Sequence, residues 1–502
     1  MSTLSELLPS GGGGSTVDFV ASGTLPNGKP VILKADGTVE VVSGAVLSTT
    51  AIPAGSEYVF NSATSNYLSI SFDPNSTGKF VIAYTDAGNS SFGTAVVGTV
   101  SGTTISFGSE YVFNASASAH NFISFDPNTA GKFVIAYRDS GNSYYGTAIV
   151  GTVSGTSISF GSEYVFNSGD SSALSISFDP NTAGKFVIAY TDVGNGYYGT
   201  AVVGTISGTT ISFGSEYVFK ADLAQTISIS FDPNTAGKFV IAYPDRNNPT
   251  SNSAYGIVVV GTVSGTTISF GSDYVFNPQS TGYLSISFDP NTAGKFVIAY
   301  SDVGNGYYGT AIVGTVSGTT ISFGSEYVFN IGTSYYLSVS FDPNTAGKFV
   351  VAYRDSDNSS FGTAVVGTVS GTTISFGSEY VFNSGASIYH SVSFDPNNTG
   401  KFVVAYKDSG NSSFGTAVVG TIYSTSTNLT TANFVGISDG AYLTAETATI
   451  AIQGGLSTNQ TGLTIGSTYY AQGDGTISTV STAPAINIGK ALSATTLLLK
   501  DL

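Results

Sequence analysis

Apolar and polar residues alternate along much of the chain with the period of two that is typical of β-strands. Residues 68–72 are apolar at every second position with serine between, which predicts a strand with one apolar face. Residues 79–84 are almost continuously apolar, as in a strand buried on both faces. Two more strands are predicted at 94–100 and 103–113, with a bulge at Gly108 in the second. Because only short turns and one loop join these four strands, they predict one four-stranded antiparallel sheet.

This four-stranded pattern recurs seven times. Its motif Gly-Ser-[Glu/Asp]-Tyr-Val-Phe opens at Gly55, Gly108, Gly161, Gly214, Gly271, Gly324 and Gly377. The successive differences are 53, 53, 53, 57, 53 and 53 residues. A fixed period near 50 with four short strands per unit is typical of a β-propeller, and a β-solenoid is the alternative, although its coils are normally shorter. The sequence therefore predicts an all-β fold with a seven-bladed β-propeller of 53-residue repeats.

The phase of the repeats predicts how such a ring closes. Residues 48–60 match 101–113, so a fourth strand precedes the first repeat. The seventh repeat has a third strand at 416–421 and then breaks off without a fourth strand. The N-terminal strand would complete the last blade, which removes free sheet edges and the aggregation hazard that they carry. We therefore predict a propeller at 48–429 that is closed by its N-terminal strand.

The two flanks of the repeats carry short strand patterns of their own. Residues 18–47 hold two short strands and a turn, and residues 430–502 hold several more. Because ring closure brings both flanks to one blade, we predict that 18–47 and 430–502 form one small β-rich domain into which the propeller is inserted. Residues 1–17, with a short helix at 4–8 and a run of glycines at 11–14, are predicted to be an anchoring peptide and linker.

Composition argues against several classes of function. Only 10% of residues are charged and the net charge is -16, so the chain lacks the basic surface that nucleic acid or an anionic membrane would require. It has no cysteine, which excludes disulfides and thiolate metal sites. The N-terminus has neither the basic nor the apolar segment of a signal peptide, and no run of about eighteen apolar residues occurs. We expect no cofactor, no membrane insertion and synthesis in the cytoplasm.

The repeats differ from one another mainly in two kinds of segment. The segments that join a fourth strand to the next first strand vary, for example 62–67, 115–120, 221–226 and 331–336. The connections from the second to the third strand vary as well, for example 85–92. In an antiparallel blade both lie on one face of the disc, and the turns of the opposite face barely change. We interpret the variable face as a binding surface, with unconstrained drift of loop residues as the alternative.

Candidate ligand-binding residues are the arginines and tyrosines of the second-to-third connections. Tyrosine rings there can stack on a sugar ring or wedge neighbouring blades together, and both interpretations stay open. Three arginines on one face also resemble the carboxylate clamp of sialidases, but no acidic nucleophile pair accompanies them, so a glycan hydrolase is the weaker alternative. The fourth repeat diverges most, with Lys220 in place of asparagine and a longer loop at 245–250. The candidate set is Arg138, Tyr144, Tyr145, Tyr197, Tyr198, Arg246, Tyr255, Tyr307, Tyr308 and Arg354.

Two rings of aspartate and the two histidines are the other candidates for chemistry. Each repeat has an Asp-Pro-Asn turn, such as that of Asp73, where we predict turn capping and pairing with the nearby Lys79. A second aspartate, such as Asp86, lacks the spacing of a calcium loop, so we predict an Asp turn and no metal site. His120 and His390 lie in separate repeats without a serine elbow or a carboxylate pair, so we predict no catalytic residues and no enzyme.

The flanks resemble terminal modules of structural proteins of tailed bacteriophages, especially marine ones. The matching text is SELLPSGGGG at 5–14, VASGTLPNGKPVILKADGTV at 20–39, FVGISDGAY at 434–442, GLTIGSTYYAQGDGTIST at 462–479 and IGKALSATTLLLK at 488–500. The resemblance covers about a quarter of the chain. It implies a component of a phage particle, with the termini attached to other virion proteins and localisation in the virion. A homotrimer is one assembly that fits such an appendage.

Together these observations predict a non-enzymatic virion appendage. The expected protein is a tail or capsid fibre whose propeller face binds a glycan or a protein receptor on the host surface. The alternative is a purely structural capsid-decoration or tail-joining protein, for which the same face packs against other virion subunits.

Overall fold

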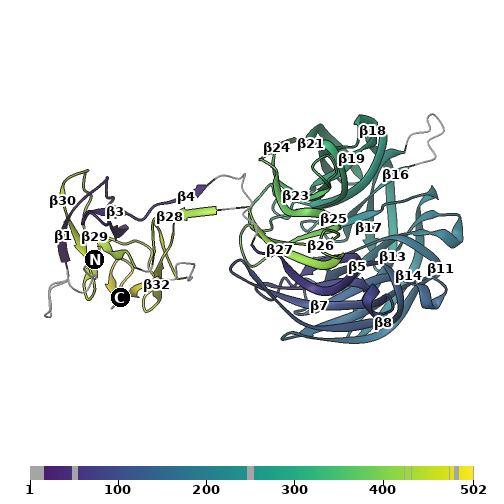
Figure 1. Cartoon of the computed structure of the whole chain (residues 1–502), viewed down its shortest axis with the longest axis horizontal. Helices are drawn as coiled ribbons and strands as arrows, with labels where there is room; N and C mark the ends of the chain where they lie inside the picture. The colour runs from purple at the N-terminus through teal and green to yellow at the C-terminus, as the bar shows by residue number, and fades with distance from the viewer. Residues whose placement is uncertain are drawn as a thin grey trace. The chain divides into compact units, whose positions relative to one another are not determined.

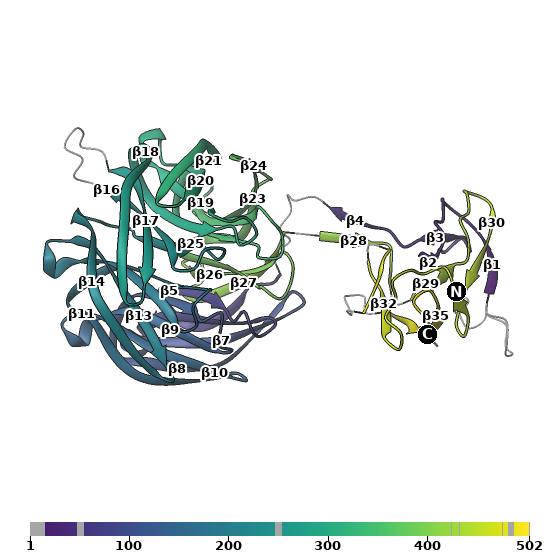
Figure 2. The same cartoon turned by 180° about the vertical axis from the view of Figure 1, so that it is seen from behind.

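The computed structural model describes residues 16–47, 55–245, 254–422, 424–430, 432–473, 475–479 and 486–500. The chain divides into two compact units (Figures 1 and 2). Residues 49–422 form the larger unit, and 1–48 together with 423–502 form the smaller one. Most of the predicted anchoring peptide, the start of the N-terminal strand at 48–54 and the candidate Arg246 lie outside the described residues.

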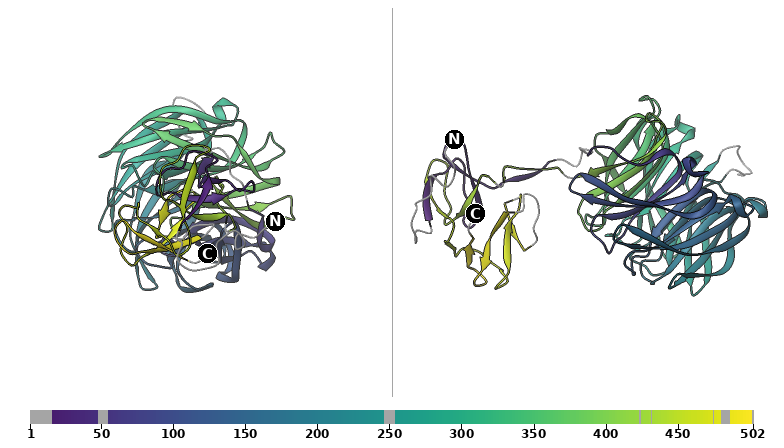
Figure 3. Two further views of the ribbon diagram at one scale, coloured as in Figure 1. Left: turned by 90° about the vertical axis from the view of Figure 1, so that its left-hand side faces the viewer. Right: turned by 60° about the horizontal axis from the view of Figure 1, so that its bottom comes forward.

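The larger unit consists of 23 antiparallel strands, β5 to β27, seen from further sides in Figure 3. They are β5 (Tyr58–Phe72), β6 (Lys79–Asp86), β7 (Phe92–Ser101), β8 (Thr104–Phe125), β9 (Lys132–Asp139), β10 (Tyr145–Ser154), β11 (Ser157–Phe178), β12 (Lys185–Asp192), β13 (Tyr198–Ser207), β14 (Thr210–Leu223), β15 (Ser228–Phe231), β16 (Lys238–Asp245), β17 (Tyr255–Ser264), β18 (Thr267–Phe288), β19 (Lys295–Asp302), β20 (Tyr308–Ser317), β21 (Thr320–Phe341), β22 (Lys348–Asp355), β23 (Phe361–Ser370), β24 (Thr373–Phe376), β25 (Tyr380–Phe394), β26 (Lys401–Asp408) and β27 (Phe414–Thr421). Single 3-10 turns follow some of the second strands, at η1 (Ala87–Asn89), η2 (Ser140–Asn142), η3 (Val193–Asn195) and η4 (Val303–Asn305). The described residues contain no α-helix, and therefore no helix that is long and apolar enough to span a membrane. The predicted all-β fold is confirmed.

The second strand of each repeat lies at the centre of its sheet. In the first repeat β6 pairs with β5 on one side and β7 on the other, so that Ile82 lies opposite both Ile70 and Val96. The five residues 80–84 are fully buried, as predicted for this segment. Both faces of β6 are covered because sheets of neighbouring repeats pack against each other. One hydrophobic cluster, for example, contains Val81 of the first repeat and Phe133 of the second.

The fourth strand of one repeat and the first strand of the next form one continuous strand in β8, β11, β18 and β21, which corrects the expectation of two strands with a connection. In β8 the first half pairs with β7 and the second half with β9. The strand is continuous because the backbone of β8 stays extended, except at His120, where φ is 51°. The bulge predicted at Gly108 is confirmed by a register shift between β7 and β8. Each long strand therefore joins two neighbouring repeats.

Serine side chains add hydrogen bonds between neighbouring repeats. The Ser69 Oγ accepts the backbone N–H of Ile123 at 3.3 Å, and the Ser391 Oγ accepts that of Ile70 at 3.2 Å. These serines occupy the polar positions of the alternating pattern in the first strands. The polar side of that strand therefore contacts the next repeat and is not simply exposed to solvent.

Residues from the two ends of the larger unit pair with each other. Strand β27 pairs antiparallel with β5, with Thr416 opposite Val59 and Phe414 opposite Thr64. The N–H of Gly55 donates to the carbonyl oxygen of Val419 at 2.9 Å. The described part of the N-terminal segment thus lies beside the last repeat.

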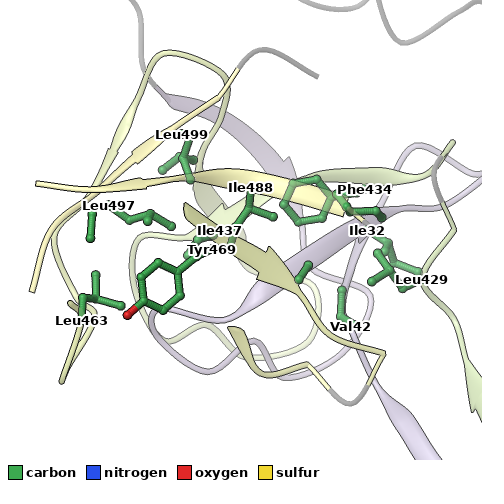
Figure 4. Close-up of a cluster of buried hydrophobic side chains, with 14 residues drawn as sticks. Ile32, Val42, Leu429, Phe434, Ile437, Leu463, Tyr469, Ile488, Leu497 and Leu499 are labelled. Carbon is green, nitrogen blue, oxygen red and sulfur yellow. The ribbon is translucent and has the colours of Figure 1, made fainter. Parts of the chain in front are cut away.

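The smaller unit contains two five-stranded sheets, in the orders β1-β30-β29-β2-β3 and β31-β35-β34-β32-β33, and the ribbon β28-β4. Its strands are β1 (Thr16–Val20), β2 (Pro30–Leu33), β3 (Val39–Val41), β4 (Gly44–Leu47), β28 (Ser424–Thr427), β29 (Phe434–Ser438), β30 (Thr447–Ala451), β31 (Leu456–Ser457), β32 (Thr468–Ala471), β33 (Ile477–Ser478), β34 (Ile486–Ala491) and β35 (Leu497–Leu499). Figure 4 shows that Ile32 and Val42 from the N-terminal flank share a core with Phe434, Ile488 and Leu497 from the C-terminal flank. The two flanks therefore bury their apolar side chains against each other.

Candidate ligand-binding pocket

One residue in each repeat adopts the left-handed backbone conformation at the same place in the repeat. These residues are Tyr67 (φ 48°), His120 (φ 51°), Ala173 (φ 46°), Thr226 (φ 52°), Tyr283 (φ 37°), Tyr336 (φ 53°) and Tyr389 (φ 57°). In the first repeat the ladder between β5 and β6 shifts register between Asn66 and Ser69, so Tyr67 and Leu68 form a bulge. All seven left-handed residues line one cavity of about 360 Å³.

Five of these seven residues form a continuous aromatic arc. The ring centroids are 5.0 Å apart for Tyr283 and Tyr336, 5.4 Å for Tyr336 and Tyr389, 5.3 Å for Tyr389 and Tyr67, and 5.0 Å for Tyr67 and His120. The planes are tilted or edge-on, which are favourable arrangements for aromatic pairs. Beyond the arc, Ala173 and Thr226 place small side chains at the remaining two positions. The arc is therefore interrupted at the third and fourth repeats.

The tyrosine hydroxyls of the arc lie close enough to affect one another. Burial, with neighbouring Tyr67, Tyr336 and Tyr283, raises the pKa of Tyr389 to about 12. The pKa of Tyr283 is also raised, by burial first and then by Tyr336. Tyr389 and Tyr283 are therefore protonated at neutral pH, and the cavity wall combines aromatic rings with hydroxyl groups that can donate and accept hydrogen bonds.

Asn121 places a buried amide beside the arc. Its Nδ2 donates to the Thr85 Oγ1 at 2.9 Å and to the carbonyl oxygen of Tyr67 at 3.3 Å. Its Oδ1 is buried and has no hydrogen-bond partner among the described residues. Asn121 is 1% exposed and lines the cavity. The equivalent residue is leucine or isoleucine in five repeats and His390 in the seventh, so comparison of the repeats could have revealed this residue, although we did not single it out from sequence.

Among the described residues, no charged side chain lines the cavity. Burial lowers the pKa of His120 to about 4, with a further contribution from the Arg138 guanidinium. Burial lowers the pKa of His390 to about 3, so both histidines are neutral near pH 7. Arg138 itself binds Asp170 through two hydrogen bonds of 2.8 and 2.9 Å and lies 4.1 Å from the centre of the Tyr144 ring.

His390 forms a serine–histidine pair that sequence reasoning missed. Its Nε2 lies 2.8 Å from the Ser387 Oγ, and its Nδ1 lies 3.3 Å from the carbonyl oxygen of Tyr336. With Nδ1 donating to that carbonyl, Nε2 accepts from the serine hydroxyl. Ser387 is buried and does not line the cavity, so its hydroxyl is closed to a substrate there. The pair orders the core of the seventh repeat.

The described residues that the sequence predicted as ligand-binding do not line the pocket. Tyr144, Tyr197 and Tyr307 are exposed at loop positions, at 45%, 50% and 41% of their surface. Tyr145, Tyr198, Tyr255 and Tyr308 open strands β10, β13, β17 and β20 and are half-buried. Arg138 and Arg354 are half-buried on β9 and β22, where the Arg354 Nη2 donates to the Ser360 Oγ at 2.7 Å. The segments identified as variable do end at lining residues, at 67, 120, 226 and 336.

Tyr307 connects the predicted set to the arc. Its ring lies 5.8 Å from that of Tyr335, which lies 5.1 Å from Tyr283. Tyr307 and Tyr283 also line a second, adjacent cavity of about 390 Å³. The aromatic surface therefore extends from the pocket toward this loop.

The two aspartate rings stabilise turns. The Asp73 Oδ1 accepts the N–H of Asn75 at 3.0 Å, which confirms turn capping, and its Oδ2 accepts the N–H of Gly131 in the next repeat at 3.1 Å. Lys79 donates to the carbonyl oxygen of Gly155 at 2.6 Å, so the predicted pairing with Asp73 is wrong. Both oxygens of the Asp73 carboxylate already accept hydrogen bonds from backbone amides, and the Lys79 side chain extends to the next repeat instead.

Six aspartates of the second ring are buried, and the side chain of the seventh, Asp245, is 14% exposed. The Asp86 Oδ1 accepts from Gly88 N at 2.9 Å and from the Asn61 Nδ2 at 3.1 Å, as expected for an Asp turn. In the fourth repeat the Lys220 Nζ takes the place of the asparagine and lies 2.6 Å from the Asp245 Oδ2. No cluster of side chains that could hold a metal ion occurs within the described ranges.

Comparison with known proteins returns solved structures alone. No family model matches the chain, and no curated protein does. Sqt1 from Chaetomium thermophilum is 10% identical with a TM-score of 0.45, over 72% of this chain and 85% of that one. Saccharomyces cerevisiae Sqt1 is 10% identical with a TM-score of 0.45, over 74% of this chain and 98% of that one.

These findings contradict the function predicted from sequence. The sequence predicts a phage tail or capsid fibre, or a decoration protein, with a receptor-binding face, whereas the solved structures that resemble the chain include fungal Sqt1 proteins. The virion, fibre, host-receptor and adhesion assignments are therefore wrong. The phage resemblance rested on short text in the flanks, and such text does not determine function.

Proposed function

We propose that this protein is a non-enzymatic ligand-binding module, a seven-bladed β-propeller whose axial pocket holds one small group of a partner molecule. The observation that carries the proposal is the ring of seven equivalent left-handed residues around one cavity, with aromatic residues on one side and small residues on the other. In this proposal the strand that contains Val59 completes the last blade, as its pairing with Thr416 supports.

The left-handed conformation supports a role for the side chains at these positions. A non-glycine residue in this region costs roughly 1–2 kcal/mol, and glycine would avoid the cost. Glycine is common elsewhere in the chain, yet none of the seven positions has it. The strain is therefore retained where the side chains meet in a pocket, which is where functional constraint is expected.

The differences among the seven residues support ligand binding over a purely structural ring. Ala173 and Thr226 adopt the same backbone conformation as Tyr67, so the fold accepts small and large side chains alike. Small residues at adjacent repeats open the aromatic ring on one side. An opening of this kind leaves a concave site, with aromatic walls and a few polar groups, of the sort that binds small groups.

Filling the opening tests the proposal. The double variant Ala173→Tyr with Thr226→Tyr would complete the ring with side chains that four other repeats already hold in this backbone conformation, so it is expected to fold. Saturation-transfer NMR would be recorded with four probes: a neutral methyl pyranoside, choline, galacturonate and a proline-rich peptide. We expect at least one probe to bind the unmodified protein, and the double variant to lose that binding with an unchanged melting temperature.

The matched control is Ile331→Tyr, which adds a tyrosine at a residue that is 78% exposed and does not line the cavity. This control should bind like the unmodified protein. Binding that persists in the double variant, or no binding of any probe class to the unmodified protein, would overturn the proposed function.

A further inference from the structure

We infer that the group held in this pocket is an uncharged sugar ring, and that Asn121 is the residue that accepts a hydrogen bond from one of its hydroxyls. This inference rests on the proposed function and names the chemical class of its ligand.

The size and walls of the cavity fit one ring. A volume of about 360 Å³ is at the lower end of the range for small-molecule sites, roughly 300–1,000 Å³. The arc from Tyr283 to His120 offers aromatic faces on which the C–H face of a pyranose can stack. The phenol hydroxyls of the arc can exchange hydrogen bonds with the hydroxyl edge of the same ring.

Asn121 supplies an acceptor that the fold itself does not use. Its Oδ1 is buried without a partner, and an unsatisfied buried acceptor costs about 1–3 kcal/mol. Leucine occupies the equivalent position at Leu68 and Leu174, so the repeat packs well without any polar group there. A ligand hydroxyl that donates to Oδ1 would recover this cost. A site built in this way discriminates strongly against ligands that lack the hydroxyl.

The charges around the pocket favour a neutral ligand. No charged side chain in the described part of the chain lines the cavity, so a carboxylate or ammonium there would be desolvated without a counter-charge from these residues. The Arg354 guanidinium acts on Tyr283 and His390, so its charge disfavours a cation at that end of the arc, whereas Arg138 near His120 is paired with Asp170. A proline ring could stack on tyrosine but has no hydroxyl for Asn121. A neutral pyranose satisfies both requirements.

The test measures affinity for the methyl pyranosides of glucose, galactose and mannose by NMR titration, with choline, galacturonate and a proline-rich peptide for comparison. We expect at least one pyranoside to bind, with saturation transfer strongest at its ring C–H protons. Asn121→Leu, which copies the residue of the first repeat, should weaken this pyranoside about fivefold to tenfold, the loss of one hydrogen bond.

A series of monodeoxy pyranosides tests the same bond on the unmodified protein, so the result does not depend on the folding of Asn121→Leu. One deoxy position should lose affinity by the same factor. Absence of binding by every pyranoside overturns the inference, as does equal affinity of all deoxy analogues. If only choline or the peptide binds, and the double-tyrosine variant loses that binding, the inference of a sugar ligand is overturned. The proposed function is then still supported.

Discussion

Tyr406 donates a hydrogen bond of 2.9 Å to the Oε1 of Glu57, a residue 349 positions earlier in the chain. Tyr406 lies on β26 in the seventh repeat, and Glu57 directly precedes β5. The same pair occurs within the chain's interior, where Tyr84 donates to the Glu110 Oε1 at 2.5 Å and Tyr190 to that of Glu216 at 2.6 Å. The Tyr406–Glu57 hydrogen bond is therefore the counterpart, between the two ends of the larger unit, of the Tyr–Glu bonds inside it.

The first prediction is that Tyr406 and Glu57 are energetically coupled. A double-mutant cycle with Tyr406→Phe and Glu57→Gln, measured by urea unfolding, should give a coupling free energy of about 1 kcal/mol. The control cycle with Tyr84→Phe and Glu110→Gln should give a similar value. A coupling near zero for the first cycle alone would show that the N-terminal strand does not complete the last blade in solution.

The second prediction is a loss of stability at alkaline pH. Burial raises the pKa of the repeated core tyrosines, such as Tyr84 and Tyr137, above the ordinary value of 10.0. Above pH 10 the unfolded chain releases protons that the folded chain retains. Their stabilising contribution is therefore complete below pH 10 and is lost as pH rises further, by about 1.4 kcal/mol per pH unit for each tyrosine.

Urea unfolding between about pH 8 and pH 11 would measure this loss. Tyr84→Phe removes one ionising group, so its free energy of unfolding should fall less steeply above pH 10 than that of the unmodified protein. Identical slopes would mean that this tyrosine ionises equally in both states.

The third prediction concerns a glycine that faces an aromatic ring. A Cβ at Gly204 would overlap the Phe186 ring of the adjacent strand, and Phe186 is fully buried. Gly204→Ala should therefore cost about 2 kcal/mol of unfolding free energy through overpacking. Adding Phe186→Leu should recover part of that loss, whereas Phe186→Leu alone should destabilise. Additive effects of the two changes would refute a direct clash.

The fourth prediction distinguishes two ways of satisfying a buried aspartate. Lys220 and Asp245 are 2.6 Å apart with side chains 19% and 14% exposed. Lys220→Met removes one partner of this largely buried pair and should cost about 3 kcal/mol. Lys220→Asn should cost less, because Asn61 supports Asp86 in the first repeat. Thermal unfolding of the two variants side by side would check the order, and equal losses would contradict it.

The chain's periodicity determined the all-β fold, the doubly buried second strand and the bulge at Gly108, because each depends on a local pattern of apolar side chains or on one residue type. Sequence also marked the segments that end at Tyr67 and His120 as variable. The pocket was not predicted from the sequence, because a single left-handed residue has no reliable local signal when it is not glycine. The sequence analysis instead predicted a ligand-binding role for tyrosines such as Tyr144 and Tyr197, which are exposed in loops.

The sequence by itself therefore determined the repeat, its strands and the face on which the repeats differ. Only the tertiary structure decided that Tyr67, Tyr283 and Tyr389, which are far apart in the chain, meet at one cavity with Asn121. The physical reason is that each repeat contributes only two or three residues to this pocket. Its shape and polarity arise from the sum of seven contributions, and no single repeat contains that sum.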